Sequence, residues 1–318
     1  MYQFVYLLRA LAAALITNAH YEDIYPLSIL ANGGLLGDVL FFGVSGFLLC
    51  PVKGTFPRWY IHRLGRIYPA VWIITLVYLF LGFYRVSGAM GLVRLLIYPT
   101  YYHFIASIVV LYVPFYIVMR LTERLGDRAV GWAAIVTAGA YLLYYCKFFD
   151  YSYYHIDDVY APMIRFLFFG AMLIGARYRL GFQQAKARRD LLQPLLLAIS
   201  LLAYFASKLL FASGRFAPAL QPVNQVVLLA VLYLSFACAL RLEDWIPRLP
   251  MPFQKGIRWL SEHTLEIYRV QYALIPRVNV GPFPLNFLAV SAAILLSAAI
   301  LHWGVERLRG LAKKTARP

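Results

Sequence analysis

Two ionisable side chains share the first strongly apolar segment of the chain. Arg9 and His20 are separated by the ten residues ALAAALITNA. On a helix, eleven steps of about 100° return to within about 20° of the same face, displaced by about 16 Å along the axis. Ionisable groups in hydrocarbon are costly and by default indicate a functional site. The spacing predicts a guanidinium near one membrane surface and an imidazole near the other. The alternatives are an Arg9 that extends to lipid headgroups and a His20 that bonds a loop carbonyl at the interface.

Carboxylates follow the histidine in the sequence. Glu22 and Asp23 come directly after it, and Asp38 begins the second apolar segment from the same side of the membrane. A carboxylate beside an imidazole fixes its tautomer and raises its basicity, as in general-base pairs. We therefore predict that His20 is a catalytic base oriented by one of these acids. Asp38 is the first choice, because it shares a predicted membrane level with His20.

The composition indicates which elements hold these groups. Of the 318 residues, 62% are hydrophobic and 14% are charged, whereas soluble domains have about 45–50% and about 25%. The apolar runs are too long and continuous for transmembrane β-strands. We therefore predict an all-α polytopic membrane protein, one domain over residues 1–318, with about ten transmembrane helices. The expected spans are 4–21, 34–51, 67–84, 97–119, 129–147, 161–176, 190–210, 223–241, 260–276 and 283–303.

The net charge of +16 is distributed unevenly along the chain. The stretches that hold 21 of the 30 Lys and Arg residues are 51–66, 120–128, 177–189, 241–258 and the tail from 304. Because basic residues concentrate on the cytoplasmic side of membrane proteins, both termini are expected in the cytoplasm. The excess positive charge then reflects the orientation of the chain in the membrane. Membrane lipids or a cytosolic anionic ligand are the partners expected to bind these basic residues. It is not a nucleic-acid-binding pattern.

Small residues and arginines stand in the next two segments. The second expected span contains Gly43, Ser45 and Gly46, which permit close approach of another helix or of a narrow ligand. The following loop ends with Arg63 and Arg66, which lie three residues apart and so on one helical face. Such a pair binds phosphate in a bidentate manner. Taken alone, helix packing and contacts with lipid phosphates explain these residues better.

The motifs occur together in a known family. Arg9-x10-His20, then LFFGVSGFLL, then Arg63-x-x-Arg66 followed by IYP and Trp72 stand in the order and at the distances of acyltransferase family 3. The chain resembles these bacterial integral-membrane O-acyltransferases of cell-surface glycans over residues 1–84, and more weakly over most of the rest. The weaker matches are His103 to Pro114, Thr264-Leu265-Glu266-Ile267-Tyr268 and Val305-Glu306-Arg307. The chain departs from the family where His103 replaces a frequent tryptophan and Gln271 a frequent histidine.

The resemblance implies a donor and an acceptor on opposite sides of a bacterial cytoplasmic membrane. The donor is acyl-CoA, usually acetyl-CoA, and the acceptor is a cell-surface or lipid-linked glycan. His20 acts as general base on the acceptor hydroxyl or is transiently acylated, and both routes stay open. The separation of about 16 Å between Arg9 and His20 is comparable with an extended pantetheine arm. The residues expected to bind the donor are Arg9, Ser45, Arg63, Arg66 and Tyr68. No metal is expected.

The acceptor is expected to meet polar and aromatic side chains outside the membrane. The segment 148–160, FFDYSYYHIDDVY, has a composition that suits stacking on sugar rings and bonding their hydroxyls. An aromatic belt at the membrane interface explains it equally well. The acceptor-binding candidates are Glu22, His103, Tyr154 and His155.

Two further predictions concern charges within the membrane. Glu266 and Arg269 lie three residues apart in the ninth expected span, and we expect them to compensate each other's charge rather than to line a CoA tunnel. The alternative to an enzyme is a transporter or exporter of a glycan or small anionic metabolite. If the protein were such a transporter, Arg9 and His20 would line the translocation path.

Overall fold

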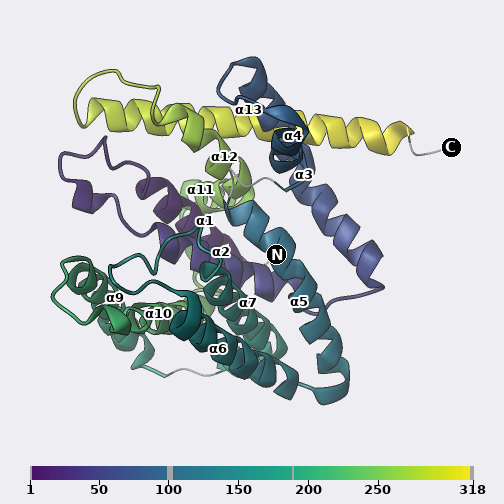
Figure 1. Ribbon diagram of the computed structural model, residues 1–318. Helices are drawn as coiled ribbons and strands as arrows, with labels where there is room; N and C mark the ends of the chain where they lie inside the picture. The colour runs from purple at the N-terminus through teal and green to yellow at the C-terminus, as the bar shows by residue number, and fades with distance from the viewer. Residues whose placement is uncertain (1, 99–102, 188–189, 316–318) are drawn as a thin grey trace.

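The computed structural model describes residues 2–98, 103–187 and 190–315, with side chains as far as Gly310. The described chain is helical and contains no strand (Figure 1), which confirms the predicted all-α class. The helices are α1 (Gln3–Asn18), α2 (Gly34–Leu49), α3 (Phe56–Phe80), α4 (Gly88–Leu96), α5 (His103–Leu125), α6 (Arg128–Phe148), α7 (Ile164–Leu180), α8 (Phe182–Ala187), α9 (Gln193–Ala212), α10 (Pro222–Arg241), α11 (Met251–Glu262), α12 (Thr264–Leu274) and α13 (Leu285–Thr315). Short 3-10 turns are η1 (Ser28–Leu30), η2 (Pro218–Leu220) and η3 (Ile246–Arg248).

Among the described residues, 7 helical segments are long and apolar enough to cross a membrane. They are Ser28–Leu49, Phe56–Phe80, His103–Leu125, Arg128–Phe148, Gln193–Ala212, Pro218–Arg241 and Leu285–Gly310. The helix α1 is a shorter apolar helix of 16 residues. The protein is therefore a polytopic helical membrane protein, while the number of ten crossings and the side of the termini stay predictions.

The ninth expected span, 260–276, is two helices rather than one. α11 ends at Glu262 and α12 begins at Thr264. Between them the side chain of His263 donates from Nδ1 to the Trp259 carbonyl at 2.8 Å. A side chain that bonds the preceding turn in this way competes with helical backbone bonding.

The third helix begins well before the expected span 67–84. α3 starts at Phe56, and Pro57 lies in its first turn, where a proline needs no backbone donor. Arg63 and Arg66 therefore lie on a helix and not at the end of a loop. Our loop assignment for 51–66 was wrong from Phe56 onward, because the basic first turns of α3 were taken for a connection.

The centre of the bundle is the contact between α2 and α7. The apolar window of Ser28–Leu49 is 72% buried, whereas that of α9 is 11% buried. A Cβ added to Gly46 would lie 2.0 Å from the Met172 carbonyl oxygen, and one on Gly175 would lie 1.8 Å from that of Gly43. These glycines let the two backbones touch, which confirms the close helix approach expected for the small residues.

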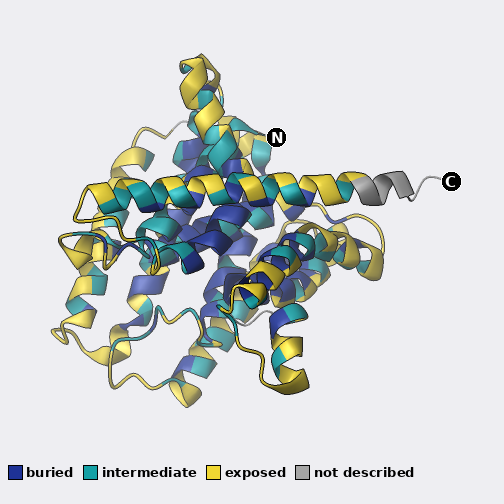
Figure 2. Cartoon of the chain, turned by 90° about the horizontal axis from the view of Figure 1, so that it is seen from above, coloured by how far each residue is buried: buried dark blue, intermediate teal, exposed yellow. Residues whose placement is uncertain are grey.

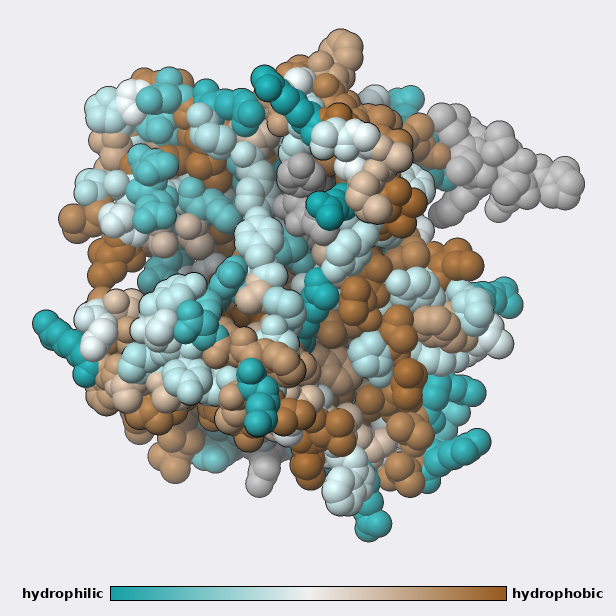
Figure 3. All heavy atoms as spheres, in the orientation of Figure 1, coloured by the Kyte–Doolittle hydropathy of each residue, from teal (hydrophilic) through white to brown (hydrophobic). Residues whose placement is uncertain are grey.

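The outer helices expose apolar side chains. Figure 2 shows the buried residues at the centre and a largely exposed α13 running across the bundle. On the face drawn in Figure 3, hydrophobic groups are prominent in the lower half and on the right, and hydrophilic groups lie across the upper left, the centre and parts of the rim. An exposed apolar surface of this kind suits contact with lipid chains.

Candidate functional site

The first helix carries Arg9 but ends before His20. α1 finishes at Asn18, and the backbone N–H of His20 donates to the Thr17 carbonyl at 3.1 Å. The helical spacing therefore holds for most of the distance between the two residues, and the imidazole stands in the turn that follows. The expectation of one continuous helix through His20 was wrong by two residues.

An internal cavity brings together four of the five residues expected to bind the donor. It has a volume of about 340 Å³, and its polar lining comes from Arg9, Ser45, Arg63, Arg66 and Tyr112. The remaining walls are apolar and come from α2, α5, Ile67 and Leu265. We call this the arginine cavity. Residues from α1, α2 and α3 that lie apart in sequence thus converge on one space.

Aromatic rings hold the cavity's guanidinium groups. The Arg9 guanidinium carbon lies 5.9 Å from the ring centroid of Phe41, and that of Arg63 lies 5.7 Å from Trp59. Glu266 and Glu262 are near enough for their charges to act on Arg9. A cation over an aromatic face loses less on leaving water than an unsupported one, so the two rings offset part of the cost of burying these guanidinium groups.

Tyr68, the fifth expected donor-binding residue, does not line the arginine cavity. Its hydroxyl donates to the Ile97 carbonyl, and its ring lies 5.5 Å from Trp72. The side chain thus connects α3 to the end of α4. A role of Tyr68 in donor binding stays a prediction.

A second group of polar side chains lies beside the arginine cavity. His103 Nε2 is 3.5 Å from Asp38 Oδ2, and its Nδ1 is 3.4 Å from the Tyr268 hydroxyl. The Tyr272 hydroxyl donates to Tyr268 at 3.5 Å, and the Tyr272 ring lies 4.9 Å from that of His20. We call these five residues the histidine cluster.

Asp38 acts on His20 through its charge, and its direct polar contact is His103. The negative charge of Asp38 also lies close enough to act on the His20 imidazole. Asp38 is buried, with 4% of its surface exposed, and its Oδ1 has no hydrogen-bond partner among the described residues. A buried carboxylate oxygen without a donor carries a free-energy cost, so this acid is held ready for a further hydrogen bond.

Two phenylalanines separate the arginine cavity from the histidine cluster. Phe41 and Phe104 both line the cavity, and their rings meet edge to face at 4.6 Å. On its other side, Phe104 lies 5.6 Å from the Tyr268 ring. Asp38, Phe41 and Ser45 follow one another on one face of α2, so this helix connects the two polar regions over about 10 Å.

The segment 148–160 touches the cluster through its last residue, in a way that the sequence did not indicate. The Tyr160 ring lies 5.4 Å from that of His103. The His155 ring is instead stacked between Phe149 at 4.3 Å and Tyr153 at 4.1 Å. Tyr154 lies near Phe211, and Glu22 is exposed. Of the four acceptor candidates, the structure brings only His103 into the cluster.

Sequence reasoning also missed Tyr268 and Tyr272 as site residues. Tyr268 belongs to the late motif Thr264 to Tyr268, and Tyr272 follows one helical turn later. Residues four apart share a helical face. That spacing was a signal that both hydroxyls point the same way, but it did not reveal which side chain they would meet.

Glu266, the acid expected within the ninth span, has a histidine as its hydrogen-bond partner. Glu266 is 6% exposed, and its Oε1 accepts from His302 Nδ1 at 3.2 Å. Arg269 donates from Nη2 to the Ile67 carbonyl at 3.1 Å. The polar contact of Glu266 thus comes from α13, and direct compensation between Glu266 and Arg269 stays a prediction.

The fold and these polar groups define an integral membrane protein with charged and hydrogen-bonding side chains gathered between its helices. The profile of a known family, described as an acyltransferase domain, matches residues 2–303. The chain belongs to this acyltransferase family, as the resemblance of its motifs implied, and it is an acyltransferase. No curated protein and no solved structure matches the chain.

Proposed function

We propose that the protein is an O-acyltransferase of the bacterial cytoplasmic membrane. It moves an acyl group, in the simplest case acetyl, from cytosolic acyl-CoA to a hydroxyl of an extracytoplasmic or lipid-linked glycan. The observation that carries this proposal is the arginine cavity, which places Arg9, Ser45, Arg63 and Arg66 beside the histidine cluster. Membership of the acyltransferase family supports the reaction class.

The arginine cavity suits the anionic donor. Arg63 and Arg66 lie three residues apart on α3, and in our proposal they bind the CoA phosphates. Arg9 is further along the path, where its charge attracts the rest of the donor. The mostly apolar walls of α2 and α5 enclose the pantetheine arm, and Ser45 offers a hydroxyl to its amides.

The histidine cluster suits the transfer step. His20 takes the proton of the acceptor hydroxyl while the hydroxyl oxygen attacks the thioester carbonyl carbon. The carbon–sulfur bond then breaks, and the CoA thiolate takes the proton from the His20 imidazolium. The buried charge of Asp38 favours that imidazolium during the step. An alternative order, in which His20 first receives the acyl group, uses the same residues.

The acceptor is proposed to approach from the side of Glu22, Tyr154 and His155. Both ring nitrogens of His103 already have partners. His103 therefore takes part by holding Asp38 and Tyr268 in place, and it has no ring nitrogen left for a sugar hydroxyl. Tyr160 closes this side of the cluster.

Transfer by the purified protein tests the proposal. Wild type, His20→Ala and His62→Ala are reconstituted in liposomes with radiolabelled acetyl-CoA and membrane glycan extract, and labelled glycan is counted. His62 is exposed on α3 and does not line the cavity, so its variant serves as the matched control. We expect His62→Ala to equal wild type and His20→Ala to lose about 10²–10⁴-fold in rate. Equal glycan labelling by His20→Ala and wild type would refute the base assignment.

A further inference from the structure

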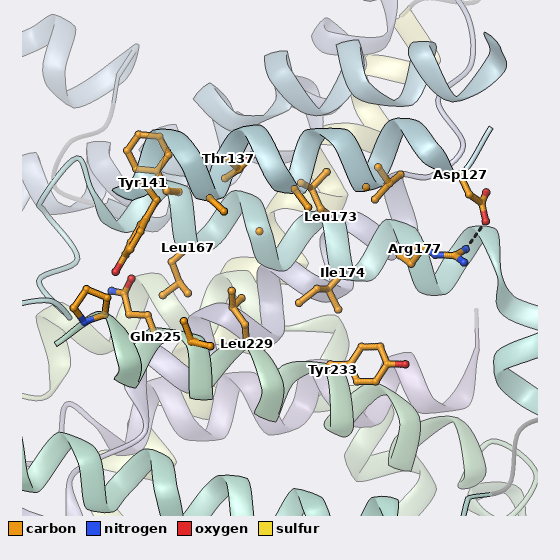
Figure 4. Close-up of a pocket in the computed structure, with 18 residues that line it drawn as sticks. Asp127, Thr137, Tyr141, Leu167, Leu173, Ile174, Arg177, Gln225, Leu229 and Tyr233 are labelled. Carbon is orange, nitrogen blue, oxygen red and sulfur yellow. Dashed lines mark hydrogen bonds and ion pairs between the residues drawn. The ribbon is translucent and has the colours of Figure 1, made fainter. Parts of the chain in front are cut away.

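A second cavity lies apart from both polar regions. It has a volume of about 550 Å³ and runs between α6, α7 and α10 (Figure 4). None of the residues assigned above to acyl transfer lines it. Its walls are side chains such as Leu167, Leu173, Ile174 and Leu229, which Figure 4 shows pointing into the space. We call it the α6–α7–α10 slot.

Small residues on α6 open the slot. Gly131, Ala134 and Ala138 all line it and recur at helical spacing. A Cβ added to Gly131 would meet no atom within 4 Å. The slot follows α7 from Phe166 to Arg177, about 16 Å of helix, which is close to the half-thickness of about 15 Å of a bilayer's hydrocarbon core. One hydrocarbon chain from one leaflet fits this length.

One end of the slot contains buried polar atoms that lack partners. The Tyr141 hydroxyl and the Oε1 of Gln225 are buried and have no hydrogen-bond partner among the described residues. Gln225 is 2% exposed, and its Nε2 donates to the Ile156 carbonyl at 2.6 Å, which fixes the direction of its amide. In Figure 4 these two side chains converge at the same end of the slot.

The opposite end carries an ion pair. Arg177 donates to Asp127 there, as the dashed line in Figure 4 marks. The charges at that end therefore compensate each other, and the unused hydrogen-bonding capacity is at the Tyr141–Gln225 end. A phenolic hydroxyl donates and an amide oxygen accepts. A ligand group that satisfies both must accept one hydrogen bond and donate another, as an alcohol hydroxyl does and an ester does not.

We propose that the α6–α7–α10 slot binds a hydroxyl-headed membrane lipid, with one hydrocarbon chain along α7 and its hydroxyl between Tyr141 and Gln225. Because lipid chains are as apolar as the slot walls, burial alone gives little preference for the slot over the bilayer. The preference comes from the buried polar pair, which otherwise stays unsatisfied. This site does not depend on the proposed acyl transfer.

Photolabelling of the full-length protein tests the site. The probe is a monoacylglycerol with a mid-chain diazirine, and its comparator is the methyl ester of the same fatty acid, which lacks the hydroxyls. Both are added to the protein in liposomes and crosslinked, and the labelled peptides are identified by mass spectrometry. We expect the monoacylglycerol to label α6, α7 and α10 saturably and the methyl ester to label them about fivefold less, the loss of one ordinary hydrogen bond.

Paired substitutions locate the ligand. Gly131→Leu places a side chain in the open slot, whereas Gly139→Leu enters open space on the same helix outside the slot. We expect Gly131→Leu to lose the labelling and Gly139→Leu to keep it. Tyr141→Phe and Gln225→Leu should reduce monoacylglycerol labelling to the level of the methyl ester. Circular dichroism and size-exclusion profiles equal to wild type establish that each variant is folded.

Two results would overturn the site. One is equal labelling of Gly131→Leu and Gly139→Leu. The other is labelling spread evenly over lipid-facing helices, α9 and α13 included, which would mean ordinary contact with bilayer lipid. Either result leaves the glycan acylation assay unaffected, so the slot and the proposed function fail separately.

Discussion

The arginine cavity and the α6–α7–α10 slot are both spaces between helices, yet they differ in what they cost the fold. The arginine cavity, about 340 Å³, is lined by three guanidinium groups and a serine hydroxyl. The larger slot, about 550 Å³, has its ion pair at one end and its unpartnered polar atoms at the other, with mostly apolar walls between them. Charges inside a membrane protein are expensive and are retained for function. Polar placement, and not volume, is therefore the reason for proposing the arginine cavity as the donor-binding region.

The helices around the two spaces also differ in packing. Next to the arginine cavity, α2 meets α7 through backbone contacts at Gly46 and Gly175. At the slot, α6 has only 17% of its apolar window buried, and Gly131 faces open space. The same residue type thus has opposite roles, because glycine permits contact in one region and leaves a gap in the other.

The largest expected effect is at the α2–α7 contact. Gly175→Ala places a Cβ 1.8 Å from the Gly43 carbonyl oxygen, so the two helices must separate. We expect the free energy of unfolding to fall by about 3 kcal/mol, measured by thermal unfolding in detergent. An unchanged melting temperature would contradict the close packing on which both spaces depend.

Removal of the buried charge in the histidine cluster should have the next largest effect. Asp38→Asn keeps a hydrogen-bonding group beside His103 but removes the negative charge that acts on His20. We expect the acyl-transfer rate to fall about 100-fold. Asp23→Asn, at an exposed acid three residues after His20, is the comparison. A larger loss for Asp23→Asn would assign the orienting role to the exposed acid.

A moderate effect is expected at the entrance of the arginine cavity. Arg63→Ala should raise the KM for acetyl-CoA about tenfold, because one charge-assisted hydrogen bond to phosphate is lost, with kcat little changed. Arg58→Ala removes an exposed arginine of the same helix that does not line the cavity. Equal KM values for the two variants, from initial rates at varied acetyl-CoA, would remove the cavity from donor binding.

The smallest expected effect is a gain in stability, whereas the preceding substitutions all cause a loss. Gly131→Ala adds a Cβ that meets no atom within 4 Å and improves helix propensity, so the free energy of unfolding should rise by about 1 kcal/mol. Thermal unfolding of the purified variant checks this, with wild-type acyl transfer as the second readout. A destabilised Gly131→Ala would mean that the slot is packed as tightly as the α2–α7 contact.

Most of the arginine cavity was predictable from the first part of the chain. Arg9, Ser45, Arg63 and Arg66 belong to motifs with characteristic spacing, and they converge as expected. The start of α3 was not predictable in the same way, because its first turns are amphipathic and resemble a basic loop. The ninth span was also misread, since hydropathy does not register the side-chain bond of His263 that separates α11 from α12.

The histidine cluster was predictable only in part. His20, Asp38 and His103 were candidates, but the sequence assigned Asp38 directly to His20, and the structure gives its polar contact to His103. Tyr160 reaches the cluster where Tyr154 and His155 were expected to act. The local backbone turns decide which side chains of a loop point into the protein. The amino-acid composition of the loop does not show which ones do.

The sequence by itself determined the helical membrane class, the acyltransferase family and most of the residues that meet in the arginine cavity. These follow from local properties: the length of apolar runs, the cost of charge in hydrocarbon and the spacing of motifs. Only the tertiary structure decided the partner of each buried polar group, such as His302 for Glu266 and His103 for Asp38. It also left the slot open between α6 and α10. Partners and cavities arise where helices distant in sequence meet, and that meeting depends on the packing of the whole bundle.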